Sequence, residues 1–303
     1  MKKHIYIYSP SGAVRDKAAF RRGVKRLQAQ GHEVEIDAVA LVSQQRFAGD
    51  DATRLAAIAR ACDSGADVAL ISRGGYGLTR ILPDINYKKI AKSIERGMLF
   101  VGISDFTAFQ NAVLAKTGAV TWAGPALCEG FGAPDGPDEI MQACFDDLLC
   151  GQGEGTGWQQ LRGIEQSALN AQNATLWGGN LTVLTALLGT PYFPDVRRGV
   201  LFLEDVAEHP YRVERMLSQL LYAGVLARQK AIVLGQFTEF TLTSHDRGFC
   251  FASVIQWLKQ RVSVPVLTNL PYGHVQTKVL LPVGARVDLV AQDRDVLMAW
   301  GHL

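Results

Sequence analysis

The alternation of strand-like and helix-like segments along the first half of the chain constrains the fold more than any other feature. Helix-like segments place apolar side chains at near-helical spacing, and several end at a glycine. The strand-like segments are 4–8, 34–39, 68–72 and 98–103, and the helix-like segments are 16–30, 53–64, 87–96 and 106–116. Alternation of this kind predicts a parallel sheet covered by helices on both faces.

The second half shows a similar but less regular pattern, and a glycine-rich segment separates the halves. In residues 150–157 glycine occupies every second position, which is typical of a linker. We therefore expect an N-terminal domain at 1–150, a linker region at 151–172 and a C-terminal domain at 173–303. Further strands are expected at 200–203, 231–234, 264–267 and 279–281, and helices at 180–188, 211–223 and 251–261.

Charge and cysteine content limit the possible partners. The chain has 31 basic and 29 acidic residues without a long run of one sign, so binding to nucleic acid or to an anionic membrane is not expected. A small neutral or zwitterionic partner suits it better. The five cysteines lie at irregular spacing without a C-x-x-C pair, which predicts no zinc site and a reducing compartment. Without a signal-peptide pattern or a long apolar stretch, we expect a cytoplasmic protein.

Ser104 is the first candidate for chemistry. It follows the apolar strand at 98–103 and precedes a helix, so it should lie at the carboxyl edge of the sheet, where α/β folds bind ligands. Gly102 leaves room for a sharp turn, and the Asp105 carboxylate is expected to bond the free N–H groups of the helix start. A plain helix cap explains the Ser104-Asp105 pair equally well. The full G-x-S-x-G motif is absent, because Phe106 replaces its last glycine.

A glycine loop ends the neighbouring strand at 68–72, with the sequence Arg73-Gly-Gly-Tyr-Gly77. Consecutive glycines allow positive φ and let backbone N–H groups point into a cleft, as an oxyanion hole requires. An ordinary tight turn is the alternative. The loop lacks the Lys-Ser/Thr ending of a phosphate-binding P-loop and the spacing of a dinucleotide-binding motif.

A serine nucleophile needs a base and an acid that orients it. His274, just after an expected strand, is the best of the six histidines as a base. Glu204 ends the apolar strand at 200–203, where a carboxylate is costly unless it is paired. Asp205 next to it is a competing acid, and Glu208 is a further one.

A second glycine-rich loop, Trp177-Gly-Gly-Asn180, precedes an expected helix in the second half. Trp177 is a candidate for one wall of a pocket, although a tryptophan buried in the core is the more common outcome. Neither glycine loop is specific by itself.

Taken together, these motifs resemble the LD-carboxypeptidase family of serine peptidases, in the same order and at similar spacing from the first strand to near the C-terminus. The residues that carry the resemblance are Arg46-Phe-Ala-Gly49, Arg73-Gly-Gly-Tyr-Gly77, Gly102-Ile-Ser-Asp-Phe-Thr107, Gly124-Pro125, Leu176-Trp-Gly-Gly-Asn180, Leu203-Glu-Asp-Val-Ala-Glu-His-Pro210, Arg212-Val-Glu-Arg-Met216 and Gly273-His274.

The resemblance implies a fold and a reaction. The expected fold is α/β, with a Rossmann-like (flavodoxin-like) parallel-sheet N-terminal domain and a smaller C-terminal α/β domain of the swivelling β/α/β type, usually in a homodimer. The expected reaction is removal of the terminal D-alanine from the L-centre of the cell-wall tetrapeptide, during cytoplasmic peptidoglycan recycling. The resemblance implies no metal or other cofactor.

The resemblance also assigns roles to residues. Ser104 becomes the nucleophile, His274 the general base and Glu204 the acid that orients it. The backbone N–H groups of Gly75 and Asp105 would form the oxyanion hole. Substrate carboxylates are expected to meet polar groups near Arg73, Trp177 and Asn180.

Two other functions compete with this interpretation. One is an immunity-type member of the same family, which cleaves a peptidyl-nucleotide antibiotic and should have an aromatic-walled nucleotide pocket. The other is a non-catalytic α/β protein that uses the fold to bind a ligand. The presence of Ser104, Glu204 and His274 together argues against a pure binding protein, because binding alone does not need all three.

Overall fold

The computed structural model describes residues 2–163 and 168–302, and the chain forms two compact units. The first unit consists of Met1–Gly153, Gly189–Pro194 and Gln276–Gly284. The second consists of Glu154–Leu188, Asp195–Val275 and Ala285–Leu303. Two short segments from the second half of the sequence therefore pack with the first unit.

The first unit is built on a six-stranded sheet in the order β11-β5-β4-β3-β1-β2. The order 2-1-3-4-5 of its parallel strands is that of a flavodoxin-like doubly wound fold, which confirms the predicted fold class. Only β11 runs antiparallel, along β5. The strands are β1 (His4–Tyr8), β2 (Glu33–Ile36), β3 (Val68–Ile71), β4 (Leu99–Gly102), β5 (Thr121–Ala123) and β11 (Leu281–Val283).

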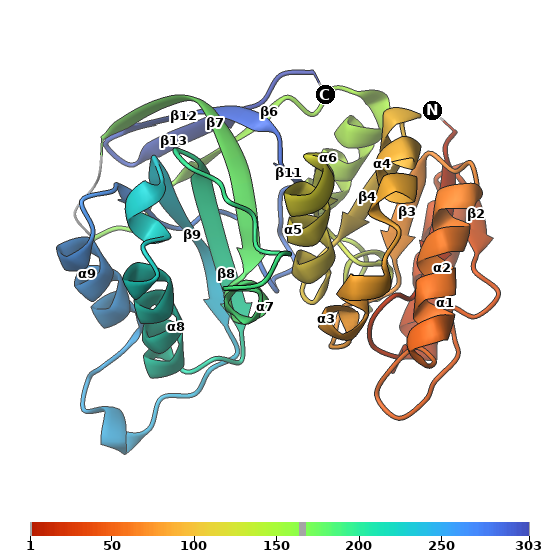
Figure 1. Cartoon of the computed structure of the whole chain (residues 1–303), viewed down its shortest axis with the longest axis horizontal. Coiled ribbons are helices and arrows are strands. Elements are labelled where there is room, and N and C mark those ends of the chain that lie inside the picture. Colours follow the sequence, from red (N-terminus) through yellow and green to blue (C-terminus); the bar gives the residue numbers. More distant parts are fainter. Residues whose placement is uncertain (1, 164–167, 303) are drawn as a thin grey trace. The chain divides into compact units, whose positions relative to one another are not determined.

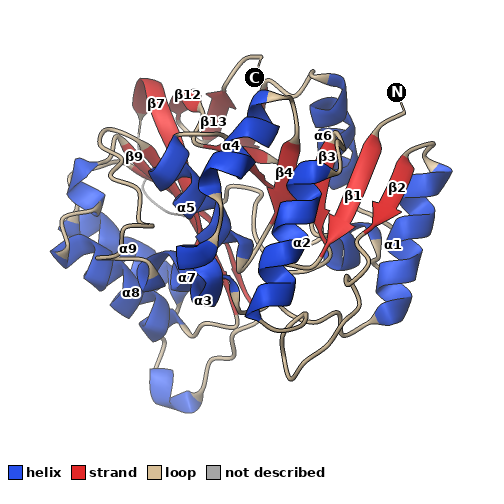
Figure 2. Ribbon diagram, turned by 45° about the vertical axis from the view of Figure 1, so that its right-hand side comes forward, coloured by secondary structure: helices blue, strands red, loops and turns tan. Residues whose placement is uncertain are grey.

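Helices cover both faces of this sheet, because the connections from β1 to β2 and from β2 to β3 run in opposite directions. Helices α2, α4 and α5 lie side by side in front of the strands in Figure 2. Helix α1 packs against the π-helical segment η2. The segments are α1 (Lys17–Ala29), α2 (Asp51–Asp63), α3 (Leu78–Ile81), η1 (Leu82–Asp84), α4 (Tyr87–Glu95), α5 (Phe106–Thr117), η2 (Leu127–Phe131) and α6 (Glu139–Cys150).

Helix α1 shows how the sequence sets these elements. The Asp16 carboxylate accepts hydrogen bonds from the first free N–H groups, at Ala18 and Ala19, and so starts the helix. Phe20, Val24 and Leu27 are buried and recur at helical spacing. The helix therefore has one apolar face, which packs onto the sheet.

The second unit contains a seven-stranded sheet in the order β10-β9-β8-β7-β12-β13-β6. Strands β7 to β10 are parallel, whereas β12, β13 and β6 are antiparallel to their neighbours. Strand β7 is long and belongs to both halves of the sheet (Figure 1). The strands are β6 (Gly155–Gln159), β7 (Leu169–Asn180), β8 (Val200–Val206), β9 (Ala231–Thr238), β10 (Val266–Leu267), β12 (Arg286–Gln292) and β13 (Asp295–Ala299).

Helices α8 and α9 pack together beside this sheet, and α8 also contacts α7 (Figure 1). The helical segments of the unit are α7 (Leu181–Ala186), α8 (Pro210–Tyr222), η3 (Leu226–Arg228), η4 (Ser244–Asp246) and α9 (Phe251–Arg261).

The glycine-rich segment at 150–157 differs most from its prediction. Its second part belongs to β6, an edge strand that pairs with β13 in register from Gly155 to Gln159. A Cβ on Gly155 would come too close to the backbone of Met298, so this glycine permits the pairing. The alternation of glycine indicated a linker because it removes the side chains that normally mark a strand.

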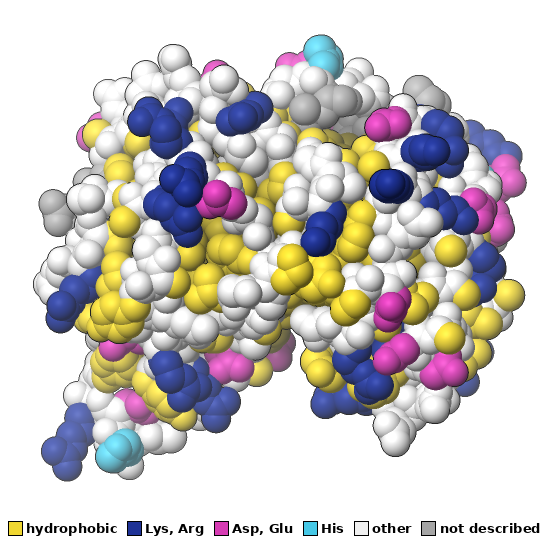
Figure 3. All heavy atoms as spheres, viewed as in Figure 1, with side chains coloured by type: hydrophobic (Ala, Val, Ile, Leu, Met, Phe, Trp, Pro, Cys, Tyr) yellow, Lys and Arg dark blue, Asp and Glu magenta, His cyan; other side chains and the backbone are white. Residues whose placement is uncertain are grey.

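No helix in the described residues is long and apolar enough to cross a membrane. On the face drawn in Figure 3, basic and acidic side chains both occur on each unit. This mixture agrees with the nearly balanced charge of the sequence.

Candidate active site

Ser104 lies where β4 ends and α5 begins, at the carboxyl edge of the first sheet. Its φ of +69° is in the left-handed region, which residues with a side chain seldom adopt. Backbone strain of this kind concentrates at functional sites. The residue is partly exposed, so the turn holds a hydroxyl group that a ligand can reach.

The glycine loop 73–77 lies directly against this serine. A Cβ on Gly74 would overlap the Cβ of Ser104 and lie 2.8 Å from its Oγ. Gly12, at the end of β1, donates its N–H to the carbonyl of Gly74 at 3.1 Å. The carboxyl ends of β1, β3 and β4 therefore meet at Ser104.

Two backbone donors belong to residues that adjoin this turn: Asp105 follows Ser104 in the chain, and Gly75 follows Gly74, which packs against Ser104. The N–H groups of Gly75 and Asp105 donate no hydrogen bond to another residue in the described part of the chain. Gly75 is exposed and has a φ of +109°, a conformation that favours glycine. Uncommitted N–H groups next to a nucleophile can stabilise an oxyanion. Their assignment to an oxyanion hole stays a prediction.

The Asp105 carboxylate does not cap α5, contrary to the expectation from sequence. Asp105 has helical backbone angles, and its side chain makes no capping hydrogen bond. The carboxylate is buried and accepts hydrogen bonds from the hydroxyl of Ser11 and from the N–H of Leu78. A plain helix cap is therefore wrong as an explanation for the Ser104-Asp105 pair.

The side chain of Arg73 contacts residues of its own unit. Its Nη1 donates to the carbonyl of Ala13 at 3.3 Å, and its Nε lies 3.5 Å from Oε1 of Glu129. Only 14% of its side chain is exposed. The arginine therefore connects the ends of β1 and β3 to the π-helical segment η2, and a role in substrate binding remains a prediction.

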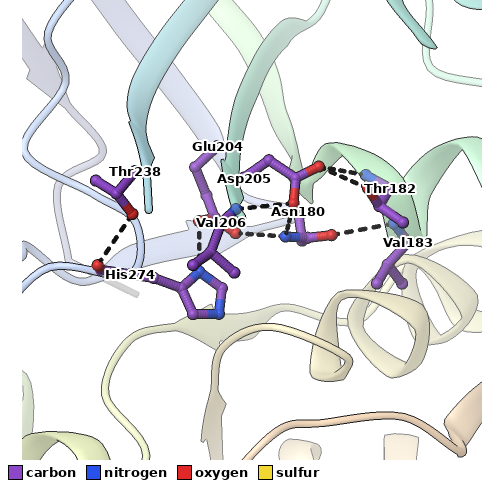
Figure 4. A network of polar contacts seen from close by, with 8 residues as sticks. All are labelled: Asn180, Thr182, Val183, Glu204, Asp205, Val206, Thr238 and His274. Atoms are coloured by element: carbon purple, nitrogen blue, oxygen red, sulfur yellow. Dashed lines mark hydrogen bonds and ion pairs between the residues drawn. The ribbon is translucent and has the colours of Figure 1, made fainter. Parts of the chain in front are cut away.

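Glu204 and His274 come together in the second unit (Figure 4). Nδ1 of His274 lies 2.7 Å from Oε2 of Glu204, whose side chain is completely buried near the carboxyl end of β8. A proton on Nδ1 that bonds a carboxylate fixes the tautomer in which Nε2 can accept a proton. Gly273 has a φ of +149°, and a Cβ added there would lie 3.3 Å from the same carboxylate oxygen.

The competing acids have other contacts. Asp205 accepts from the N–H and the hydroxyl of Thr182, at 2.9 and 2.8 Å, and so holds the first turn of α7 (Figure 4). Burial, and then the nearby Glu204, raise the pKa of Asp205. Glu208 lies 3.7 Å from Arg212 on the first turn of α8. Of these three carboxylates, that of Glu204 forms the hydrogen bond with His274.

Trp177 and Asn180 are buried and make hydrogen bonds within the second unit. Trp177 is fully buried, and its indole N–H donates to Oε1 of Gln229 at 3.0 Å, so it is a core residue. The Asn180 amide donates to Glu204 at 3.2 Å and to Asp205 at 2.9 Å, while its oxygen caps α7. Asn180 therefore supports Glu204, and direct contact with a substrate stays a prediction for both residues.

Ser11 and Arg54 are two residues near the site that the sequence analysis did not single out. Ser11 bonds Asp105, and Arg54, fully buried, donates from Nη1 to the carbonyl of Gly77 at 2.7 Å. The signal for Arg54 was its position four residues before the core residue Ile58, which puts a charge on the buried side of α2.

The first unit therefore offers a serine next to free backbone donors, and the second unit offers a histidine with a buried acid. These are the groups that acyl transfer uses. In the described residues, no three His, Cys, Asp or Glu side chains form a group that could hold a metal ion.

Two family models match the chain. The LD-carboxypeptidase N-terminal domain matches residues 5–124, and the LD-carboxypeptidase C-terminal domain matches residues 173–289. Together they cover most of the sequence.

Solved structures and curated proteins give the same result. The structure of muramoyltetrapeptide carboxypeptidase from Oxalobacter formigenes is 40% identical, with a TM-score of 0.89 over 98% of both chains. A putative carboxypeptidase of Synechocystis is 33% identical over 93% of this chain and 90% of its own. A probable murein peptide carboxypeptidase of Bacillus subtilis is 29% identical over 86% and 81%. The microcin C7 self-immunity protein MccF of Escherichia coli is 25% identical over 76% and 73%.

Proposed function

Because this chain belongs to the LD-carboxypeptidase family, we propose that it removes the terminal D-alanine from peptidoglycan tetrapeptides and leaves the tripeptide. The family and the carboxypeptidase relatives show a serine-type peptidase. The finer substrate is our inference, supported by the names of the Oxalobacter and Bacillus relatives. The observation that carries the chemistry is the 2.7 Å contact between His274 and the buried Glu204.

In the first step Ser104 attacks the carbonyl carbon of the bond between the L-centre of the diamino acid and D-alanine. Nε2 of His274 takes the proton from the serine Oγ as the new C–O bond forms, and Glu204 stabilises the resulting imidazolium. The tetrahedral oxyanion accepts hydrogen bonds from the N–H groups of Gly75 and Asp105. Losing one such donor typically costs about 10²–10³ in rate.

In the second step the C–N bond breaks, and His274 gives its proton to the leaving amine of D-alanine. Water then attacks the acyl-enzyme, and His274 takes a proton from this water and returns it to Ser104. The mechanism requires Ser104 and His274 to come within hydrogen-bond reach in the substrate complex. This requirement is part of the proposal.

The test compares substrates that differ at one end. The protein is incubated with free and sugar-linked tetrapeptides, with tripeptide and pentapeptide as controls, and D-alanine release is followed by mass spectrometry. We expect release from the tetrapeptide only, and none with the Ser104→Ala variant, which should still bind the substrate. Release that is unchanged in Ser104→Ala would overturn the assignment of the nucleophile.

The same experiment separates the competing functions. A peptidyl-nucleotide substrate is included because the chain is also similar to the immunity protein MccF. Faster cleavage of this substrate than of the tetrapeptide would support the immunity function. Tetrapeptide binding without turnover in the wild type would support a non-catalytic binding protein.

A homodimer in the cytoplasm completes the proposal. Removing D-alanine from muropeptides returned to the cell is a cytoplasmic step of peptidoglycan recycling. Light scattering during size-exclusion chromatography should give twice the chain mass of 33.0 kDa, and fractionation should place the protein with cytoplasmic markers. A monomeric mass would remove the dimer from the proposal without affecting the reaction.

A further inference from the structure

The side chain of Asp105 has a role that its position next to Ser104 does not explain. The residue is 1% exposed, and α5 does not use its carboxylate as a cap. Its Oδ2 accepts from the Leu78 N–H at 2.9 Å and from the Ser11 hydroxyl. A buried carboxylate that accepts several hydrogen bonds is held firmly in one place.

These bonds join three segments that meet at the carboxyl edge of the first sheet. Ser11 follows β1, Gly77 and Leu78 end the glycine loop after β3, and Asp105 follows β4. The carboxylate therefore ties together the two segments that carry the uncommitted N–H groups of Gly75 and Asp105.

Arg54 holds the same loop from the other side. Its Nη1 donates to the carbonyl of Gly77, so the peptide unit between Gly77 and Leu78 has its carbonyl bonded by Arg54 and its N–H, that of Leu78, bonded by Asp105. The arginine is completely buried and forms an ion pair with Asp51, and its guanidinium lies 5.0 Å from the centre of the Phe47 ring. Two buried groups of opposite charge therefore hold one peptide unit between them.

The glycine loop depends on this support because its glycines give the backbone little conformational preference of its own. Gly75 and Gly77 both have positive φ, and Gly75 and Tyr76 are exposed. Unsupported glycines sample many backbone conformations. An oxyanion donor works only when it is already placed about 3 Å from the developing charge. The loop is fixed at its start by the bond between Gly12 and Gly74 and at its end by Asp105 and Arg54.

We propose that the Asp105 carboxylate, together with Ser11 and Arg54, is a positioning group that holds the glycine loop so that the Gly75 N–H faces the oxyanion. This inference rests on the proposed nucleophile Ser104. Asp105 thus has two roles. Its backbone N–H acts as one oxyanion donor, and its side chain positions the other donor, the N–H of Gly75.

The test uses Asp105→Asn, which keeps the shape of the side chain but replaces one acceptor oxygen with an NH₂ group. The matched control is Asp16→Asn, because Asp16 caps α1 and otherwise makes an exposed ion pair with Arg22, and asparagine caps helices equally well. We expect kcat for D-alanine release to fall about 10²-fold in Asp105→Asn, with KM changed less than threefold, because one oxyanion donor is misplaced. The control should behave as the wild type does.

A second readout separates positioning from folding and from the choice of substrate. A fluorophosphonate probe reacts with an activated serine, and its phosphoryl oxygen uses the same oxyanion donors as the substrate. We expect labelling of Ser104 to slow at least tenfold in Asp105→Asn, while the near-UV circular dichroism and the substrate Kd, measured in a Ser104→Ala background, stay unchanged. Ser104→Ala itself should not be labelled.

Each outcome tests either the positioning role of Asp105 or the proposed tetrapeptide substrate. Wild-type kcat and labelling rates in a folded Asp105→Asn protein would overturn the positioning role. If Asp105→Asn does not fold, Ser11→Ala replaces it, with an expected loss of about fivefold in both rates, and an unchanged rate would overturn the proposal. The probe could label the wild type faster than Asp105→Asn while the wild type releases no D-alanine. This result would reject the proposed substrate and keep the positioning role.

Discussion

Gly74 lacks a side chain at the place where the side chain of Ser104 packs against the glycine loop. A Cβ on Gly74 would overlap the Cβ of Ser104 and would lie 3.2 Å from the carbonyl oxygen of Ile103. The backbone of Gly74 has no positive φ that would favour glycine. Glycine is needed at this position because the side chain of Ser104 leaves no room for a Cβ. The glycine loop 73–77 and the turn at Ser104 therefore pack closely against each other within the first unit.

The first prediction follows from this fit. Gly74→Ala should displace Ser104 and lower kcat for D-alanine release by at least 10²-fold, because misplacing a reacting group by about 1 Å costs that much. The fluorophosphonate probe should label this variant slowly. Gly157→Ala is the matched control, because a Cβ there would make only ordinary contacts. Full activity in Gly74→Ala would show that the loop yields without disturbing Ser104.

The pair of Glu204 and His274 gives the second prediction. Glu204→Gln should lower kcat by about 10³–10⁴, because an amide no longer fixes the His274 tautomer or stabilises the imidazolium. Glu208→Gln is the control, since Glu208 makes an ion pair of 3.7 Å with Arg212 on the first turn of α8. Kinetics at several pH values would measure both variants. A loss of less than tenfold in Glu204→Gln would mean that another acid orients the base.

The turn at Ser104 shows which parts of the candidate site could be predicted from the sequence. An apolar strand followed by Ser104 and a helix predicted the position of the hydroxyl, because strand and helix periodicities are local properties. The bond between Glu204 and His274 joins residues 70 positions apart. The sequence favoured His274 as the base, but only the family resemblance selected Glu204 among the three possible acids. The role of the Asp105 carboxylate was missed, because its partners come from β1 and β3.

The fold was predictable to a similar extent. The parallel sheet of the first unit follows from the alternation of patterns, and its strand order is the flavodoxin-like one. Strands β6, β12 and β13 were not recognised, since β6 contains two glycines and β12 and β13 carry the apolar residues Val290 and Leu297 on their exposed faces. Their stability depends on tertiary pairing more than on local preference.

The third prediction concerns acid stability. Burial raises the pKa of Asp37, but hydrogen bonds from Arg60, Tyr6 and the Val39 N–H outweigh it and hold this pKa below the usual 3.8. The unfolded chain therefore binds this proton more readily, and the stabilisation is fully present above about pH 4.5 and is lost as the pH falls through the folded-state pKa. Asp37→Asn should lower the free energy of unfolding by about 1–3 kcal/mol at pH 7.

Urea unfolding of both proteins between pH 7 and pH 3 would measure this difference. It should stay constant from pH 7 to pH 5 and decrease below the unfolded-state pKa of Asp37. Asp135→Asn serves as a control, because Asp135 is exposed and caps no described helix. A difference between wild type and Asp37→Asn that grows on acidification would have the wrong sign and would contradict the assignment.

The last prediction concerns the thiols, which are all free. Burial, followed by the nearby Glu129, raises the pKa of Cys128 to about 12, and burial also raises the pKa of Cys62. Because only a thiolate reacts, neither should be alkylated in the folded protein at pH 7.5, whereas the exposed Cys150 should react within minutes. Iodoacetamide labelling followed by peptide mass spectrometry, with and without urea, measures this order. Labelling of Cys62 or Cys128 before Cys150 in the folded protein would mean that the first unit opens locally around those residues.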